Sequence, residues 1–192
     1  VDPVDPVTPT PIYNPSVPGY VETPRVDMEL GYATLRTLHE RRGENQTLAW
    51  DECGDCGLEA KGQVWARIFG SHLEQDGKTR FGMDTDTYGI QAGYDFAVKR
   101  NDKDGHRLTG LYFAYGRANT DFSDKYRAVN GIISDDKYTG NGKTDAYSLG
   151  ITNTYYKSNG TYLDLVGQAS FLQNKYDSRS NVTANNNGFG LI

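Results

Sequence analysis

The sequence predicts an all-β fold: an antiparallel up-and-down sheet of the transmembrane β-barrel type, preceded by one helix. Three observations lead to this prediction. From Gly62 onward, apolar and polar residues alternate with a period of two, as in a strand with two different faces. The alternating segments run to roughly 12 to 16 residues, longer than soluble strands and enough to cross a bilayer at barrel tilt. Their connections alternate between long and short, as in membrane-crossing hairpins.

The composition agrees with a folded chain and excludes several functions. Of the 192 residues, 14 are Tyr and 22 are Gly, which is unlike a disordered chain even though the mean hydropathy is -0.68. A barrel wall alternates polar and apolar residues, so a low mean hydropathy is compatible with it. No apolar run reaches the roughly 18 residues of a membrane helix. The net charge of -5 argues against a nucleic-acid partner.

The first 23 residues are predicted to form an extended linker. All seven prolines lie at or before Pro24, and their fixed φ and missing amides favour a polyproline-like tether. A helix is predicted over residues 24–43, with Thr23 as N-cap, Pro24 in the first turn and Gly43 as the stop. Its apolar residues form no clean stripe, so the sequence does not commit it to a hydrophobic core. Since neither an initiator Met nor a signal peptide precedes Val1, we expect a longer parent chain.

Five strands are predicted at 63–74, 87–98, 107–121, 144–157 and 161–176, and a sixth begins near Gly188. Together they make residues 63–192 a partial barrel. The short turn at Asn159-Gly160 suits a type I′ hairpin, because both residues tolerate positive φ. The alternation assigns ten side chains to a lipid-facing surface: Tyr88, Ile90, Tyr94, Phe96, Tyr147, Leu149, Ile151, Leu163, Leu165 and Phe171. Four polar side chains are assigned to the opposite face: Arg67, Gln91, Asp95 and Gln168.

Aromatic residues near the predicted strand ends suggest girdles at the two membrane interfaces. Tyr176 is among the residues assigned to them, beside Tyr88, Tyr94, Phe96, Phe113, Tyr115, Tyr147, Tyr155 and Tyr162. Two other interpretations stay open. A soluble β-sandwich used as a binding module would turn the aromatic face toward its own core. A structural or adhesin-like outer-membrane barrel would use its long loops to bind host surfaces.

Three stretches carry a family resemblance. They are Tyr13-Asn14-Pro15-Ser16-Val17-Pro18 with the helix that follows, Trp65-Ala66-Arg67-Ile68-Phe69-Gly70, and residues 86–95. In this order they resemble the start of the C-terminal translocator domain of a classical monomeric autotransporter (type V secretion) of the pertactin-like group. The resemblance implies a twelve-stranded barrel in the bacterial outer membrane, of which about half is present here. It also implies a helix in the barrel lumen and an N-terminal passenger exported to the cell surface.

The resemblance also names partners and residues. The expected partners are the lipid bilayer of the outer membrane, the passenger in cis and the outer-membrane barrel assembly machinery. The helix would meet the lumen wall through Leu30, Leu35, Arg36, Leu38, Arg41 and Arg42. Its arginines and Glu40 would face the polar positions Gln91, Asp95 and Gln168.

The connecting segment 44–62 contains the only two cysteines, Cys53 and Cys56. We expect a small local disulfide in the oxidising periplasm; free thiols are the alternative. A redox site would need a thioredoxin-like context, and a zinc site would need a second ligand pair, neither of which the sequence offers. Nucleophile-elbow, zincin, Walker and dinucleotide motifs are also missing. We therefore expect no enzyme activity, no catalytic residue, no metal and no cofactor.

Overall fold

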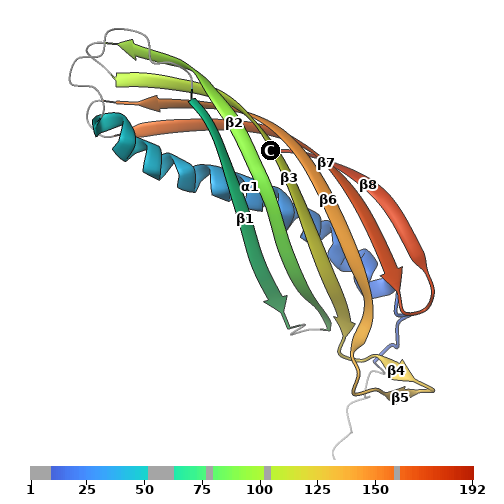
Figure 1. The fold of residues 1–192 in the computed structure, drawn as a ribbon. Coiled ribbons are helices and arrows are strands. Elements are labelled where there is room, and N and C mark those ends of the chain that lie inside the picture. The colour runs from blue at the N-terminus through green and yellow to red at the C-terminus, as the bar shows by residue number, and fades with distance from the viewer. Residues whose placement is uncertain (1–9, 52–62, 77–79, 102–104, 158–160) are drawn as a thin grey trace, which may run out of the picture.

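The computed structural model describes residues 10–51, 63–76, 80–101, 105–157 and 161–192. One long helix, α1 (Val17–Asp51), precedes six long strands (Figure 1). The strands are β1 (Gln63–Gln75), β2 (Phe81–Asn101), β3 (Gly105–Asp124), β6 (Tyr138–Tyr156), β7 (Tyr162–Ser178) and β8 (Thr183–Leu191). A small hairpin of β4 (Ala128–Val129) and β5 (Ile132–Ile133) interrupts the connection between β3 and β6.

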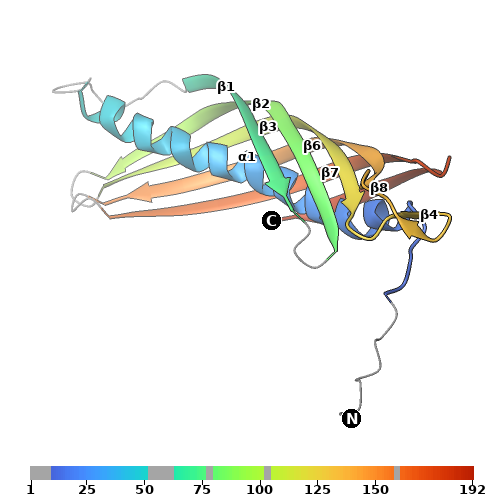
Figure 2. The same cartoon turned by 90° about the horizontal axis from the view of Figure 1, so that it is seen from below.

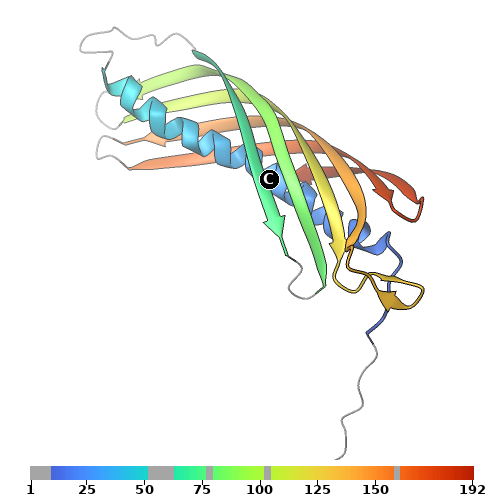
Figure 3. The same cartoon turned by 60° about the horizontal axis from the view of Figure 1, so that its bottom comes forward.

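The long strands form one antiparallel sheet in the order β1-β2-β3-β6-β7-β8. Each strand pairs with the next long strand along the chain, which is an up-and-down topology. The sheet is curved, and α1 lies along its concave side (Figures 1 and 2). The start of α1 lies at the same end of the sheet as the β4–β5 hairpin (Figure 3). We call this end the mouth. The predicted antiparallel fold with one N-terminal helix is confirmed.

Three strands begin at least five residues earlier than the sequence predicted. β2 begins at Phe81 rather than residue 87, β6 at Tyr138 rather than 144, and β8 at Thr183 rather than 188. In each case the added residues lie toward the mouth. Apart from Tyr138, their exposed side chains are polar there, as at Asp84 and Asp86 of β2. The alternation of apolar residues therefore stops before the backbone ladder does.

The helix is longer than predicted at both ends, so its predicted bounds of 24–43 and the linker bounds of 1–23 are wrong. The helix begins at Val17, which places Pro18 in the first turn, where its missing amide needs no partner. Asn14 shapes this start: its Oδ1 accepts a hydrogen bond from the Ser16 amide (3.0 Å) and its carbonyl one from the Val17 amide (3.0 Å). Pro24 lies inside the helix, where proline ordinarily costs about 3 kcal/mol. Packing against the sheet offsets this cost.

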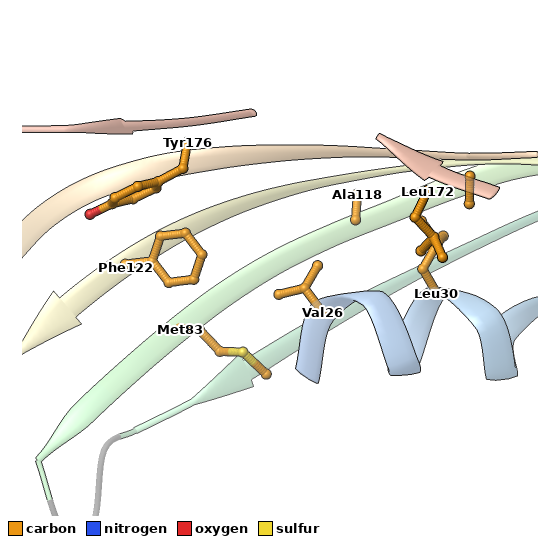
Figure 4. Close-up of a cluster of buried hydrophobic side chains, with 8 residues drawn as sticks. Val26, Leu30, Met83, Ala118, Phe122, Leu172 and Tyr176 are labelled. Carbon is orange, nitrogen blue, oxygen red and sulfur yellow. The ribbon is translucent and has the colours of Figure 1, made fainter. Parts of the chain in front are cut away.

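A small hydrophobic core joins α1 to the sheet on the concave side (Figure 4). From α1 it contains Val26 and Leu30, which lie one turn apart. The sheet contributes Met83, Ala118, Phe122, Ala146, Leu172 and Tyr176. Tyr176 is therefore a core residue, and its assignment to an aromatic girdle is wrong. The mouth-proximal part of the concave face is more apolar than the alternation suggested.

Large inward aromatic rings lie over glycines of neighbouring strands. Gly150 of β6 lies under the Tyr112 ring of β3, and a Cβ there would come closer than 3.0 Å to ring atoms. Gly93 of β2 is covered in the same way by Trp65 of β1. Because real Cβ atoms do not approach so closely, these glycines let bulky rings lie flat against the wall. The rings then fill the space between the wall and the helix.

Candidate functional site

The convex face of the sheet carries the predicted lipid-facing residues. The structure leaves exposed nine of the ten, namely Tyr88, Ile90, Tyr94, Tyr147, Leu149, Ile151, Leu163, Leu165 and Phe171. The side chain of the tenth, Phe96, lies outside the described part of the chain. The strand register aligns several of these residues across the sheet. One row runs through Ile68, Ile90, Tyr115, Tyr147, Phe171 and Phe189.

The apolar surface is a band of limited height. On β3 the outward positions between Arg107 and Arg117 are Thr109, Leu111, Phe113 and Tyr115. Ten residues at about 3.3 Å each span about 33 Å along the strand. At a barrel tilt of about 40° this corresponds to about 25 Å along the membrane normal, the height of the apolar band of outer-membrane barrels. Charged side chains thus bracket the band on β3.

A paired charge marks the mouth-side border of the band. The Arg117 guanidinium donates to both carboxylate oxygens of Asp145, at 2.7 and 3.0 Å. The Tyr115 hydroxyl donates to the same carboxylate at 2.7 Å. Since each charge has a partner, this cluster can lie at a lipid–water interface without an isolated ion. Aromatic and charged groups meet here as they do at barrel rims.

The concave face holds α1 by a buried hydrogen-bond network centred on Gln168 of β7. Its Nε2 donates to Thr34 Oγ1 of α1 (2.9 Å) and to Ser170 Oγ (3.0 Å). Its Oε1 accepts from the Tyr112 hydroxyl of β3 (2.6 Å). Gln91 of β2 donates to the Thr34 carbonyl at 3.3 Å. Thr34 is thus tied to β2 and β7 at once.

A second polar contact lies two helical turns nearer the mouth. Asn174 Nδ2 of β7 donates to Asp27 Oδ2 of α1 (2.8 Å). Its Oδ1 accepts from the Thr144 hydroxyl of β6 (2.7 Å). Among the described residues, Asp27 Oδ1 has no hydrogen-bond partner. The helix is therefore fixed to the wall by polar groups beside and beyond its apolar contact through Val26 and Leu30.

The predicted inward residues lie on this face of the sheet. Gln91, Asp95 and Gln168 are buried, and Arg67 is half-buried and lines a cavity between α1 and β1–β2. On the helix, Leu30 is fully buried and Leu35 lines the same cavity. The side chains of Arg36, Leu38, Glu40, Arg41 and Arg42 lie outside the described part, so their expected contacts stay predictions. Cys53 and Cys56 lie outside it as well.

Sequence reasoning missed the helix residues that make the polar contacts, Asp27 and Thr34. Together with Val26 and Leu30 they follow helical spacing, so Val26, Leu30 and Thr34 face the wall one turn apart. Because exposed Tyr20, Met28 and Tyr32 lie on other sides of the helix, the hydrophobic pattern was blurred. A search for polar as well as apolar residues at i, i+4 and i+8 would have found the wall-facing row of Val26, Leu30 and Thr34.

The mouth loops carry their own ion pairs. The Arg179 guanidinium hydrogen bonds to Asp136, and this contact lowers the pKa of the Asp136 carboxyl below its ordinary value. The Tyr138 amide, which donates to the same carboxylate at 3.1 Å, lowers the pKa further. The pair joins the β7–β8 turn to the long β3–β6 connection. It holds two surface loops together.

The described residues show neither a metal site nor a helical membrane span. No group of three or more His, Cys, Asp or Glu side chains in the described ranges could hold a metal ion. The helix of the described chain lacks the apolar length needed to cross a bilayer.

Comparison with known proteins gives three matches. Residues 64–191 match the sequence model of the Autotransporter beta-domain family. The chain is 29% identical over 167 residues to a protein of Escherichia coli (strain K12) named "Probable autotransporter YcgV", covering 84% of this chain and 15% of that one. The fold is similar to the crystal structure of the transport unit of the autotransporter AIDA-I from Escherichia coli, with a TM-score of 0.57. That match has 20% identity and covers 77% of this chain and 48% of the other.

Proposed function

The chain belongs to the autotransporter β-domain family, and from this premise we propose that it exports a passenger joined to its N-terminus to the bacterial cell surface. The family is one of outer-membrane translocators. The chain spans about half the length of the solved structure it resembles and a smaller part of its curated relative. The passenger and the transport step are therefore our proposal for the whole protein.

One observation carries this proposal: α1 lies along the polar concave face and leaves it at the mouth. Residues 10–16, which directly precede α1, therefore lie at the end of the sheet that carries the β4–β5 hairpin (Figure 3). A passenger attached there would already be on the loop side. In this mechanism α1 follows the last exported residues of the linker, and it stays in the lumen when the passenger has passed. The contacts of Thr34 with Gln168 and of Asp27 with Asn174 would hold it in place.

The convex face suits an anchor in lipid. Its apolar band of about 25 Å matches the outer surface of known barrels. The outer edges of β1 and β8 have no partner strand within the described chain. Backbone groups left unpaired in lipid cost several kcal/mol each, so these edges need cover from further strands or from the outer-membrane barrel assembly machinery. We thus propose a domain division of a linker up to Ser16, a lumen helix over 17–51 and a barrel from residue 63.

Transport by this route needs no catalytic residue. With no nucleotide-binding motif in the sequence, the free energy would come from passenger folding and barrel assembly. The interior wall provides small and hydroxylated side chains, such as Ser148, Ser170 and Thr152, which hydrogen bond without strong charge. Such a wall would let an unfolded chain slide past.

Deleting residues 64–176 tests the proposal. In cells expressing the full-length protein, we expect passenger synthesis to continue and its display to be lost, measured with an antibody on intact and on lysed cells. The matched control deletes only the β4–β5 hairpin and should leave display intact. Display that survives the larger deletion would contradict export by this domain.

A further inference from the structure

At the mouth, Arg80 and Asp124 form a buried ion pair that joins two strand ends. Arg80 precedes β2 and Asp124 ends β3. The guanidinium donates from Nε to Oδ1 (3.0 Å) and from Nη2 to Oδ2 (3.1 Å). The Arg80 side chain is 13% exposed and that of Asp124 is 3% exposed. Asp124 Oδ1 also accepts the Tyr126 amide at 3.0 Å. A two-pronged pair of this kind fixes the plane of the guanidinium.

This fixed guanidinium binds a residue of the linker. The Arg80 Cζ atom lies 3.9 Å from the centre of the Tyr13 ring. The rings of Phe81 and Tyr126 lie 5.5 Å from the same atom, and those of Tyr13 and Phe81 are 6.0 Å apart. A cation over an aromatic face is attractive, and more so when the cation is shielded from water. Tyr13 thus stacks on the Arg80 guanidinium, which residues at the ends of β2 and β3 hold in place. We call Arg80 together with Asp124 and Tyr126 the cationic shelf.

The next linker residues are held from the far side of the sheet. The Tyr176 hydroxyl of β7 donates to the Pro15 carbonyl (3.1 Å), and Ser180 Oγ donates to Asn14 Oδ1 (3.2 Å). Residues 13–15 therefore stretch across the mouth from the β2–β3 corner to β7. Asn14 also shapes the first turn of α1. The chain has two anchors directly before the helix starts.

We propose that Arg80, Asp124 and Tyr126 form a latch that grips Tyr13 and sets where the exported linker stops. The inference rests on the proposed function, since it concerns the last segment to be exported. When Tyr13 reaches the shelf, Asn14 and Pro15 reach β7, and α1 is then in register with Gln168. The latch closes this part of the mouth over the helix. Without it, Tyr13 and the residues before it would detach from the wall, and only the contacts with β7 would hold the start of α1.

Nitroxide mobility at the linker tests the latch directly. Ile12 is exposed and adjacent to Tyr13, so we place a spin label at Ile12→Cys in the full-length protein, with Cys53 and Cys56 replaced by Ser. In outer membranes the label should be largely immobile. Arg80→Ala should raise the ratio of mobile to immobile label about 2- to 30-fold, the range that a lost cation–π contact implies. Arg80→Lys should raise it less, because it retains the charge.

Two further variants keep the test decisive if Arg80→Ala perturbs the barrel. Tyr13→Ala lies outside the sheet and should give the same increase, and the double variant should add nothing to either single change. Arg127→Ala is the control, because this mouth guanidinium bonds to Ser134 Oγ (3.2 Å) and the Asp136 carbonyl (2.7 Å), so the label should stay immobile. An immobile label in Tyr13→Ala, or additive effects in the double variant, would overturn the latch.

Passenger display measured on the same cells should be unchanged in Arg80→Ala. If the protein without substitutions did not display its passenger, the proposed export itself would be refuted.

Discussion

Replacing Gln168 with Leu should release α1 from the wall. Gln168 is 2% exposed, and its amide bonds to Thr34, Tyr112 and Ser170. Leucine has a similar size and none of these bonds. Each lost bond costs about 1 kcal/mol, and a buried hydroxyl without a partner about 1 to 3 kcal/mol. Tyr112 loses its acceptor, whereas Thr34 still donates to the Gly31 carbonyl at 2.7 Å. The expected loss in free energy of unfolding is about 2 to 4 kcal/mol.

The assay is urea unfolding of the full-length protein in lipid vesicles, followed by tryptophan fluorescence. Trp65 is a suitable reporter because its ring lies 6.5 Å from that of Tyr112. The matched control is Gln173→Leu on the same strand, whose side chain is exposed on the convex face. It should change the free energy of unfolding by less than about 0.5 kcal/mol.

A double-mutant cycle identifies the helix as the partner. Thr34→Val should destabilise the protein, and its effect should add incompletely to that of Gln168→Leu, with a coupling of about 1 kcal/mol. If Gln168→Leu matched Gln173→Leu, or if the two inner substitutions were fully additive, the network would not hold the helix.

Two other changes test the convex face and the mouth loops. Leu149→Lys places a charge in the middle of the apolar band, where Leu149 is 62% exposed, and should cost about 2 to 4 kcal/mol on insertion into vesicles. Asn141→Lys, on the polar mouth-side part of the same strand, should cost no more than about 1 kcal/mol, and equal effects would contradict a lipid-facing band. At Asp136 the folded-state pKa is lowered chiefly by Arg179, so the contribution of the pair to loop order is present above the unfolded pKa and is lost as pH falls through the folded value. Arg179→Ala should move the Asp136 titration up toward its ordinary range in an NMR titration, and an unchanged midpoint would show that the pair does not form in solution.

The sequence predicted the wall better than the helix, for a physical reason. Alternate residues of a strand in a barrel wall face two different environments, lipid and lumen. Neighbours such as Ile90 and Gln91 therefore indicate opposite faces by their polarity alone. A helix against a polar wall packs on polar and apolar side chains together. Its contacts therefore mix Val26 and Leu30 with Asp27 and Thr34. No stripe of uniform polarity exists to be found.

The bounds of α1 show how packing overrides local signals. Thr23-Pro24 has the form of a helix start, with a capping side chain followed by a proline. In the structure the Thr23 hydroxyl donates to the Gly19 carbonyl at 2.6 Å, inside a continuous helix. Gly19 lies under the Tyr176 ring, where a side chain would collide. The first turns of α1 are thus held by contacts with the wall. The sequence of the helix alone does not reveal those contacts.

The sequence predicts no strand between residues 121 and 144, and it therefore misses the β4–β5 hairpin for a related reason. Its strands are two residues each, too short for a period to be visible. Asn130 and Gly131 have φ values of 52° and 81°, which a type I′ turn requires, so the local signal was present. This turn signal lies within a long connection, and the length of the connection favoured a loop over a hairpin.

The three groups of contacts made by the linker and α1 differ in chemistry along the chain, and this order fits a segment that stops rather than one that passes. Nearest the mouth, Tyr13 meets a guanidinium that is already paired. Next, Val26 and Leu30 enter an apolar core, and beyond them Thr34 joins a buried amide network. A chain sliding through the wall offers each of these sites a mismatched residue, and a mismatch at any buried polar group costs free energy. Only one register satisfies all three sites together. The wall thus selects the position of the helix by the same contacts that hold it there.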